Sequence, residues 1–134
     1  MITPTNEWLL LVIHVLGVSV WVGGQLTLAS LVKTIRANSD GILPLVARQF
    51  ARISWPAFAI VAVSGVLLLL QVDPPEQGTS YSVTLAVKLA LVCVAASAVV
   101  VHSASSRRII IALGGAIGLL ASLLALALGL LLGS

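Results

Sequence analysis

The sequence predicts an all-α integral membrane protein, an up-down bundle of four transmembrane helices that forms a single domain over residues 1–134. Hydrophobic residues make up 60% of the chain and charged residues only 8%, a balance that soluble domains do not show. In addition, four apolar stretches each approach or exceed the length of about 20 residues that crosses a bilayer as a helix. The chain is expected to pack helix against helix in lipid.

The four spans follow one another with short connections. They are predicted at residues 8–32, 55–72, 81–102 and 109–132. The second span has two alternative beginnings: a short amphipathic extension from Leu45, or one continuous helix that Pro56 kinks. The connection Asp73-Pro74-Pro75-Glu76-Gln77-Gly78 is a turn. Short connections make neighbouring helices antiparallel.

Charge asymmetry predicts the orientation of the spans. The basic side gathers Lys33, Arg36, Arg48, Arg52, Arg107 and Arg108 against Asp40 alone, and the other side carries Glu7, Asp73 and Glu76 and no Lys or Arg. By the positive-inside rule the basic loops are cytoplasmic and both termini lie outside. Basic residues that flank spans in this way exclude a nucleic-acid partner and leave the lipid bilayer as the expected one. Arg48, Arg52, Arg107 and Arg108 are assigned to topology or to lipid headgroups.

The last span carries a stripe of small residues. Gly114 and Gly118 form a GxxxG pattern that lets two helix backbones approach closely. Packing within the protein's own bundle is preferred over dimerisation, because the pattern is common.

Two titratable side chains, His14 and Lys88, lie inside otherwise apolar spans. Ionisable residues at membrane depth are candidates for function because each costs about 2.5–3.5 kcal/mol to insert. Glu7, His14 and Trp21 are spaced by seven residues and share a helix face, as do Tyr81 and Lys88. At 1.5 Å per residue, His14 and Lys88 each lie about 10 Å from the outer end of their spans. We therefore expect them to meet.

The chemistry of this pair leaves several alternatives open. Two like charges would repel, so either His14 is neutral beside a cationic Lys88, or burial removes the proton from Lys88. A neutral imidazole ligates metals, and a cationic Lys88 pairs with Glu7 or with an anionic ligand. The alternative without function has His14 bonded to a neighbouring helix and Lys88 reaching the interface.

Other residues narrow the kind of site. Trp21, Gly23 and Gly24 line the same span, where two glycines permit close helix contact or the approach of a flat ligand. His102 lies about 20 Å from His14 along the membrane normal, so the two cannot share one metal or haem. Cys93 points away from the Lys88 face. No motif of a catalytic nucleophile, phosphate loop or zinc site is present, so no catalytic residue is assigned and an enzyme is the less favoured class.

With these residues in view, the chain resembles the copper resistance protein D (CopD) family. The matching stretches are HVLGVSVWVGG from His14 to Gly24, RQFAR from Arg48 to Arg52 followed in the second span by Ser64-Gly65, and YSVTLAVKLALV from Tyr81 to Val92. The resemblance implies a multi-pass protein of the bacterial inner membrane, associated with copper uptake or tolerance. It implies His14 as a ligand and Trp21, Gly23, Gly24 and Lys88 as motif residues.

A weaker similarity is to HemJ-type protoporphyrinogen oxidases, four-helix membrane proteins that bind haem. They also pair a histidine of the first helix with a later lysine, near a run that Lys88-Leu89-Ala90-Leu91-Val92 approximates. The L-P-R-L string of that family has no counterpart here.

Three functions are therefore carried forward. The leading one is a CopD-like protein that handles copper, or a copper-linked cofactor, at an outward-facing site near His14. The second is a redox protein that binds haem b, with His14 as axial ligand and Lys88 against a propionate. The third is a non-catalytic accessory subunit of a larger membrane complex. A homo-oligomer is an alternative partner state.

Overall fold

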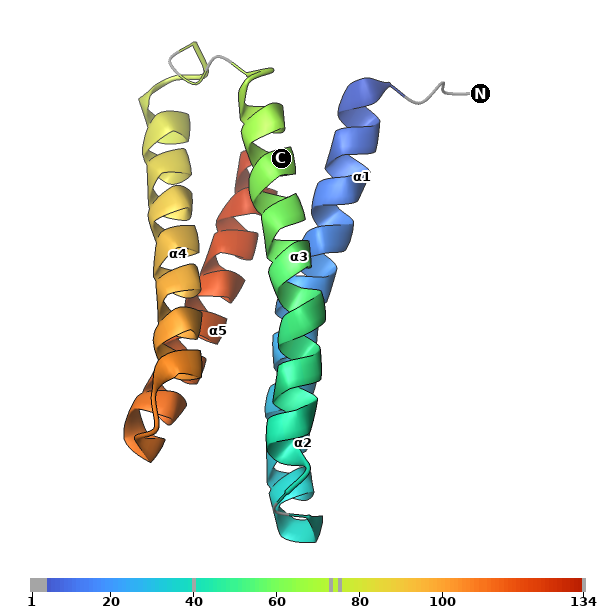
Figure 1. Cartoon of the computed structure of the whole chain (residues 1–134). Coiled ribbons are helices and arrows are strands. Elements are labelled where there is room, and N and C mark those ends of the chain that lie inside the picture. The colour runs from blue at the N-terminus through green and yellow to red at the C-terminus, as the bar shows by residue number, and fades with distance from the viewer. Residues whose placement is uncertain (1–4, 40, 73, 75, 134) are drawn as a thin grey trace. The chain divides into compact units, whose positions relative to one another are not determined.

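The structure, a computed structural model, describes residues 5–39, 41–72, 74 and 76–133. These residues form helices joined by short turns, and strands are absent from the described part of the chain (Figure 1). Four continuous helical stretches are long and apolar enough to cross a membrane: Asn6–Asn38, Leu43–Leu69, Thr79–Ala104 and Arg108–Leu132. The all-helical class and the four predicted spans are thereby confirmed.

The helices extend beyond the predicted spans, chiefly on the basic side of the first two. The first is composed of α1 (Asn6–Val18), a π-helical turn η1 (Ser19–Gly23) and α2 (Gly24–Asn38), whereas the prediction ended at residue 32. The second, α3 (Leu43–Leu69), begins twelve residues before the predicted residue 55. Hydropathy detects only the apolar part of a helix, so it does not detect polar turns at the helix ends.

Pro56 lies inside α3, which runs through it as one helix. Of the two predicted alternatives, the continuous helix from the region of Leu45 is therefore observed. Pro44 occupies the first turn of α3, where a missing N–H costs nothing. At Pro56 the missing donor does cost α3 a bond, because the Arg52 carbonyl loses its usual partner four residues on.

The chain divides into two compact units, Met1–Val72 and Asp73–Ser134. The first unit is a hairpin in which α1, η1 and α2 pack antiparallel to α3. The two helices approach each other closely at Gly17, which is buried. A Cβ atom at Gly17 would lie 2.8 Å from Val61 Cγ2 and 3.1 Å from the Ala57 carbonyl oxygen. Glycine at this position lets the two backbones meet.

The second unit is a hairpin of α4 (Thr79–Ala104) and α5 (Arg108–Leu132). Gly114 and Gly118 are buried against α4: a Cβ at Gly114 would lie 3.0 Å from the Ala98 carbonyl oxygen, and one at Gly118 would lie 3.2 Å from Val99 Cγ2. The small-residue stripe thus packs within its own chain, as the preferred alternative predicts.

The turn before α4 is tied to that helix. Gly78 has a φ of 95°, a conformation that suits glycine, and immediately precedes α4. The Ser82 hydroxyl donates to the Pro74 carbonyl at 3.0 Å. Asp73 and Pro75 of the predicted turn lie outside the described residues, as does Asp40 of the earlier connection.

Candidate functional site

His14 lies partly buried on α1 and contacts α3. Its Nδ1 is 3.0 Å from the hydroxyl oxygen of Ser64, a residue that is only 3% exposed. The ring also lies over Gly65, where a Cβ would come within 3.1 Å of His14 Cε1. Ser64 and Gly65 therefore form the surface on which the imidazole rests.

The hydrogen bonds of Ser64 determine the tautomer of His14. The Ser64 hydroxyl has a single hydrogen, and it donates this hydrogen to the Ile60 carbonyl at 2.5 Å. Since a carbonyl oxygen can only accept, the hydroxyl must accept from His14. His14 therefore carries a proton on Nδ1, and in the neutral imidazole the lone pair is then on Nε2. This is the form, with one nitrogen held by a neighbour, in which histidine ligates metals.

Trp21 is at the centre of an aromatic cluster below His14 in the same unit. It is 5% exposed, and its ring centroid lies 5.8 Å from that of Trp55 and 4.6 Å from that of Phe58. Trp21 belongs to the π-helical turn η1. Such turns are rare and often occur at functional sites. The predicted motif residue is thus in the interior, with α3 supplying its partners.

The two motif glycines differ in their surroundings. A Cβ at Gly24 would lie 2.5 Å from Phe50 Cε2, so Gly24 permits the contact between α2 and α3. A Cβ at Gly23 would meet nothing within 4 Å. Gly23 is therefore not required for helix contact among the described residues.

Polar residues beyond Trp21 bond mainly within their own helix. The Thr27 hydroxyl donates to the Gly23 carbonyl at 2.8 Å, and the Ser30 hydroxyl donates to the Thr27 carbonyl at 2.7 Å. Gln25 differs, because its side-chain nitrogen is buried without an acceptor among the described residues. An unmade hydrogen bond of this kind carries a cost of about 1–3 kcal/mol.

Lys88 lies partly buried in the second unit and faces α5. A Cβ at Gly129 would be 3.3 Å from Lys88 Nζ and 3.4 Å from its Cε, so the missing side chain makes room for the amine. Gly129 lies in the last turn of α5, which ends at Leu132. Backbone carbonyls at a helix C-terminus lack amide partners and attract a cation. Lys88 therefore has a helix terminus as its neighbour.

Glu7 is exposed in the first turn of α1. The helix begins there because the Thr5 hydroxyl accepts from the Trp8 amide at 3.2 Å, and an acidic residue in a first turn favours the helix dipole. Among the described residues, no contact supports the predicted place of Glu7 in the site. His14 and Lys88 belong to different units, so their meeting stays a prediction.

The described residues contain no group of three or more His, Cys, Asp and Glu side chains close enough to hold one metal ion. Cys93 is exposed on α4. His102 is bonded through Nδ1 to the Ile111 carbonyl at 2.5 Å, within its own hairpin. Among the described residues of the first unit, His14 is the one imidazole, and Glu7 two turns away is the one carboxylate.

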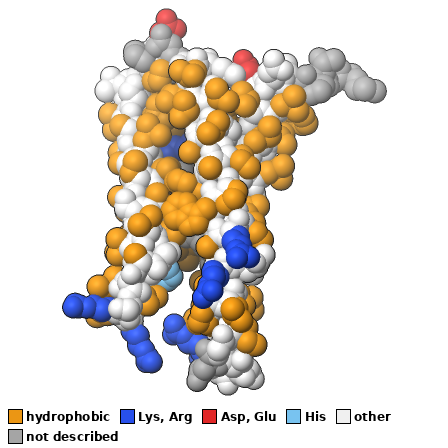
Figure 2. Space-filling model, viewed as in Figure 1, with side chains coloured by type: hydrophobic (Ala, Val, Ile, Leu, Met, Phe, Trp, Pro, Cys, Tyr) orange, Lys and Arg blue, Asp and Glu red, His pale blue; other side chains and the backbone are white. Residues whose placement is uncertain are grey.

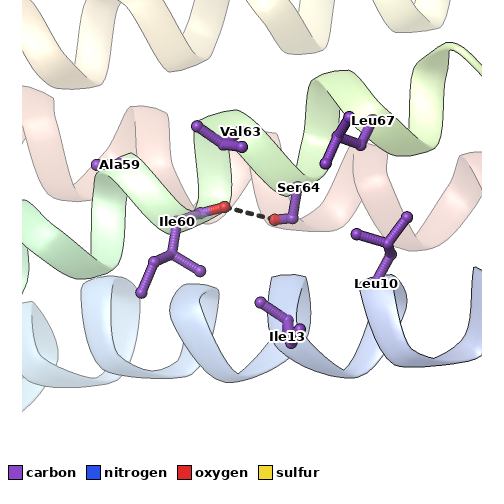
Figure 3. A pocket seen from close by; sticks show the side chains of 7 residues that line it. All are labelled: Leu10, Ile13, Ala59, Ile60, Val63, Ser64 and Leu67. Carbon is purple, nitrogen blue, oxygen red and sulfur yellow. Dashed lines mark hydrogen bonds between the residues drawn. The ribbon is translucent and has the colours of Figure 1, made fainter. Parts of the chain in front are cut away.

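A shallow groove of about 380 Å³ runs between α1 and α3 beside this region (Figure 3). Its seven lining residues are apolar except Ser64, and Leu10 and Ile13 of α1 face Ile60 and Ser64 of α3 across it. Apolar walls of this kind suit lipid acyl chains and supply no further polar ligand.

Comparisons of the chain with protein-family models, with curated proteins and with solved structures find no match. The resemblances to the CopD family and to HemJ-type oxidases therefore stay predictions that rest on the motifs alone. The sequence identified His14 and Trp21 as site residues. It singled out Ser64 and Gly65 only as part of the resemblance to the CopD family and Gly129 only as part of the small-residue stripe, and their contacts with His14 and Lys88 were not predicted.

Proposed function

We propose that this chain is a small CopD-like multi-pass membrane protein that handles copper, or a copper-linked cofactor, at an outward-facing intramembrane site at His14. The proposal includes an up-down four-helix bundle in the bacterial inner membrane, with both termini outside. The four apolar helices support a membrane location. The charge asymmetry supports the orientation.

The observation that carries the proposal is the bond between His14 and Ser64. A bond from His14 to a neighbouring helix is also what the alternative without function predicts, so the cofactor measurement below decides between the two. Here a buried hydroxyl, itself anchored to the α3 backbone, orients the ring and directs the lone pair to Nε2. Groups that orient a ligating histidine in this way raise metal affinity by about 10–100-fold.

The described donors fit copper only in part. One imidazole is a suitable ligand for copper, but the described residues of the first unit contain no second histidine and no cysteine. The remaining ligands would come from Glu7, from the N-terminal amine, which lies outside the described residues, or from a second copy of the chain. We therefore assign His14 as the ligand that the chain supplies and derive no transport step from it.

The alternative is a protein that binds haem b, and one observation favours it. Haem iron needs only one axial side chain when its four other ligands are porphyrin nitrogens. A single oriented imidazole meets that requirement without further donors. Lys88 would pair with a propionate in this alternative. A third candidate, an accessory subunit of a larger membrane complex, needs no cofactor.

The deciding experiment measures copper and haem in protein purified in mild detergent. Bound copper without a Soret band supports the leading proposal, and a Soret band supports the alternative. His14→Ala should abolish either signal. His102→Ala removes the other imidazole of the chain and is the matched control, expected to retain the cofactor.

Ser64→Ala tests the orienting role separately. We expect it to weaken cofactor binding by about 10–100-fold while the protein stays helical. Wild-type protein that takes up neither copper nor haem, or a His14→Ala variant that retains its cofactor, contradicts the assignment of His14.

A further inference from the structure

We propose that Arg48 and Arg52 on α3 form a binding surface for the phosphate of an anionic phospholipid. The inference is independent of the cofactor proposed at His14. It rests on the depth of the two residues along α3, on their shared face, and on the charges around them.

Depth is the first argument. Because α3 is continuous through Pro56, the helix itself measures how far each arginine lies from its outer end at Leu69. Arg52 is about 26 Å and Arg48 about 32 Å from Leu69, at 1.5 Å per residue. The hydrocarbon core of a bilayer is about 30 Å thick. The two guanidinium groups therefore lie at its inner boundary, where lipid phosphates are.

Geometry is the second argument. Residues four apart on a helix lie on one face, one turn above the other. Both arginine side chains are exposed. A guanidinium group binds phosphate oxygens through two parallel hydrogen bonds, which a lysine ammonium does not. Two guanidinium groups about 6 Å apart along the helix suit the headgroup of a single lipid.

Charge is the third argument. Glu7 is the one carboxylate among the described residues of the first unit, and it lies at the opposite end of the hairpin, in the first turn of α1. It is therefore too distant to neutralise the arginines. Figure 2 shows most Lys and Arg side chains toward the end of the view opposite the Asp and Glu side chains, with one further basic side chain among the apolar ones. Apart from Asp40, which lies outside the described residues, the first unit therefore offers the two arginines no carboxylate at their end of the hairpin, and an anionic headgroup is a suitable partner.

Lys33 and Arg36 on α2 offer a matched control. Gly24 of α2 lies against Phe50 of α3, which sets the register of these antiparallel helices. Lys33 is nine residues beyond Gly24, so it lies roughly 10 Å farther from the bilayer than Arg48. Both control side chains are exposed. Replacing Lys33 and Arg36 removes two positive charges from the first unit, as replacing Arg48 and Arg52 does. The two control residues differ in that they lie outside the headgroup layer.

The test is native mass spectrometry of the detergent-purified chain with added phosphatidylglycerol or phosphatidylcholine of identical acyl chains. Because a micelle has no inner and outer side, lipid retention in this experiment does not depend on which way the protein is inserted in the membrane. Wild-type protein should retain phosphatidylglycerol preferentially. Each basic residue near a membrane surface contributes about fivefold to lipid affinity, so Arg48→Gln with Arg52→Gln should lose on the order of 25-fold. Lys33→Gln with Arg36→Gln should stay within about twofold of wild type.

Arg48→Lys with Arg52→Lys keeps the charge and removes the paired hydrogen bonds, and it should give an intermediate loss. Far-ultraviolet circular dichroism reports whether the glutamine variant folds. If it does not fold, the lysine variant takes its place in the comparison with wild type. The proposal is overturned if wild-type protein shows no preference for the anionic lipid. It is equally overturned if the α3 variants bind as wild type does, or if the α2 control loses as much as the α3 variants.

Discussion

The packing of α1 against α3 should depend on the absence of a side chain at Gly17. The Cβ of alanine at this position would lie 2.8 Å from Val61 Cγ2 and 3.1 Å from the Ala57 carbonyl oxygen. Carbon atoms in favourable contact are about 3.5–4.0 Å apart. The helices must therefore separate or Val61 must move when Gly17 is replaced by alanine.

Two terms determine the size of the effect. Forcing an extra carbon into a packed contact costs about 1–3 kcal/mol. Alanine has the higher helix propensity and returns about 0.8–1 kcal/mol. Gly23→Ala is the matched control, because its Cβ would meet nothing within 4 Å and it gains only the propensity term. The difference between the two variants therefore isolates the packing cost, about 1–3 kcal/mol with Gly17→Ala the less stable.

The assay is equilibrium unfolding in mixed detergent micelles with increasing sodium dodecyl sulfate, followed by circular dichroism. Val61→Ala removes the atom that the new Cβ would meet. Combined with Gly17→Ala, it should give a variant less destabilised than the sum of the single changes, since the two sites are in contact. Equal stability of Gly17→Ala and Gly23→Ala would refute the close approach at Gly17.

Two further predictions test the remaining helix contacts. Trp21→Ala should lower the free energy of unfolding by about 3–5 kcal/mol, because it removes the central ring of the aromatic cluster with Trp55 and Phe58. The control is Trp8→Ala, at a position that is 52% exposed. In the same unfolding assay it should change the free energy of unfolding by less than about 1 kcal/mol. Similar losses in both would contradict the burial of Trp21. Gly129→Val should displace Lys88 from α5 and so raise the rate at which an amine-reactive reagent modifies Lys88. Peptide mass spectrometry measures this rate relative to that of Lys33, the internal reference. An unchanged ratio of the Lys88 rate to the Lys33 rate would contradict the contact between Lys88 and Gly129.

The sequence was sufficient to predict the number, class and approximate position of the spans. Their lengths and hydrophobicity are properties of each segment, so no knowledge of neighbours is needed. The same holds for the small-residue face of the last span, where Gly114 and Gly118 were expected to pack against another helix. The extension of the second helix from the region of Leu45 was also predicted, whereas the true end of the first helix was not, because the turns from Lys33 to Asn38 are too polar for a hydropathy signal.

By itself, then, the sequence determined that this protein has four apolar helices with His14 and Lys88 placed inside them. Only the tertiary structure decided that His14 rests on Ser64 and Gly65, that Lys88 lies against Gly129, and that a π-helical turn carries Trp21 into an aromatic cluster. The physical reason is that a helix's own pattern fixes which residues share a face. The partner across the interface depends on rotation and register, which close contacts such as that of Gly17 with α3 set.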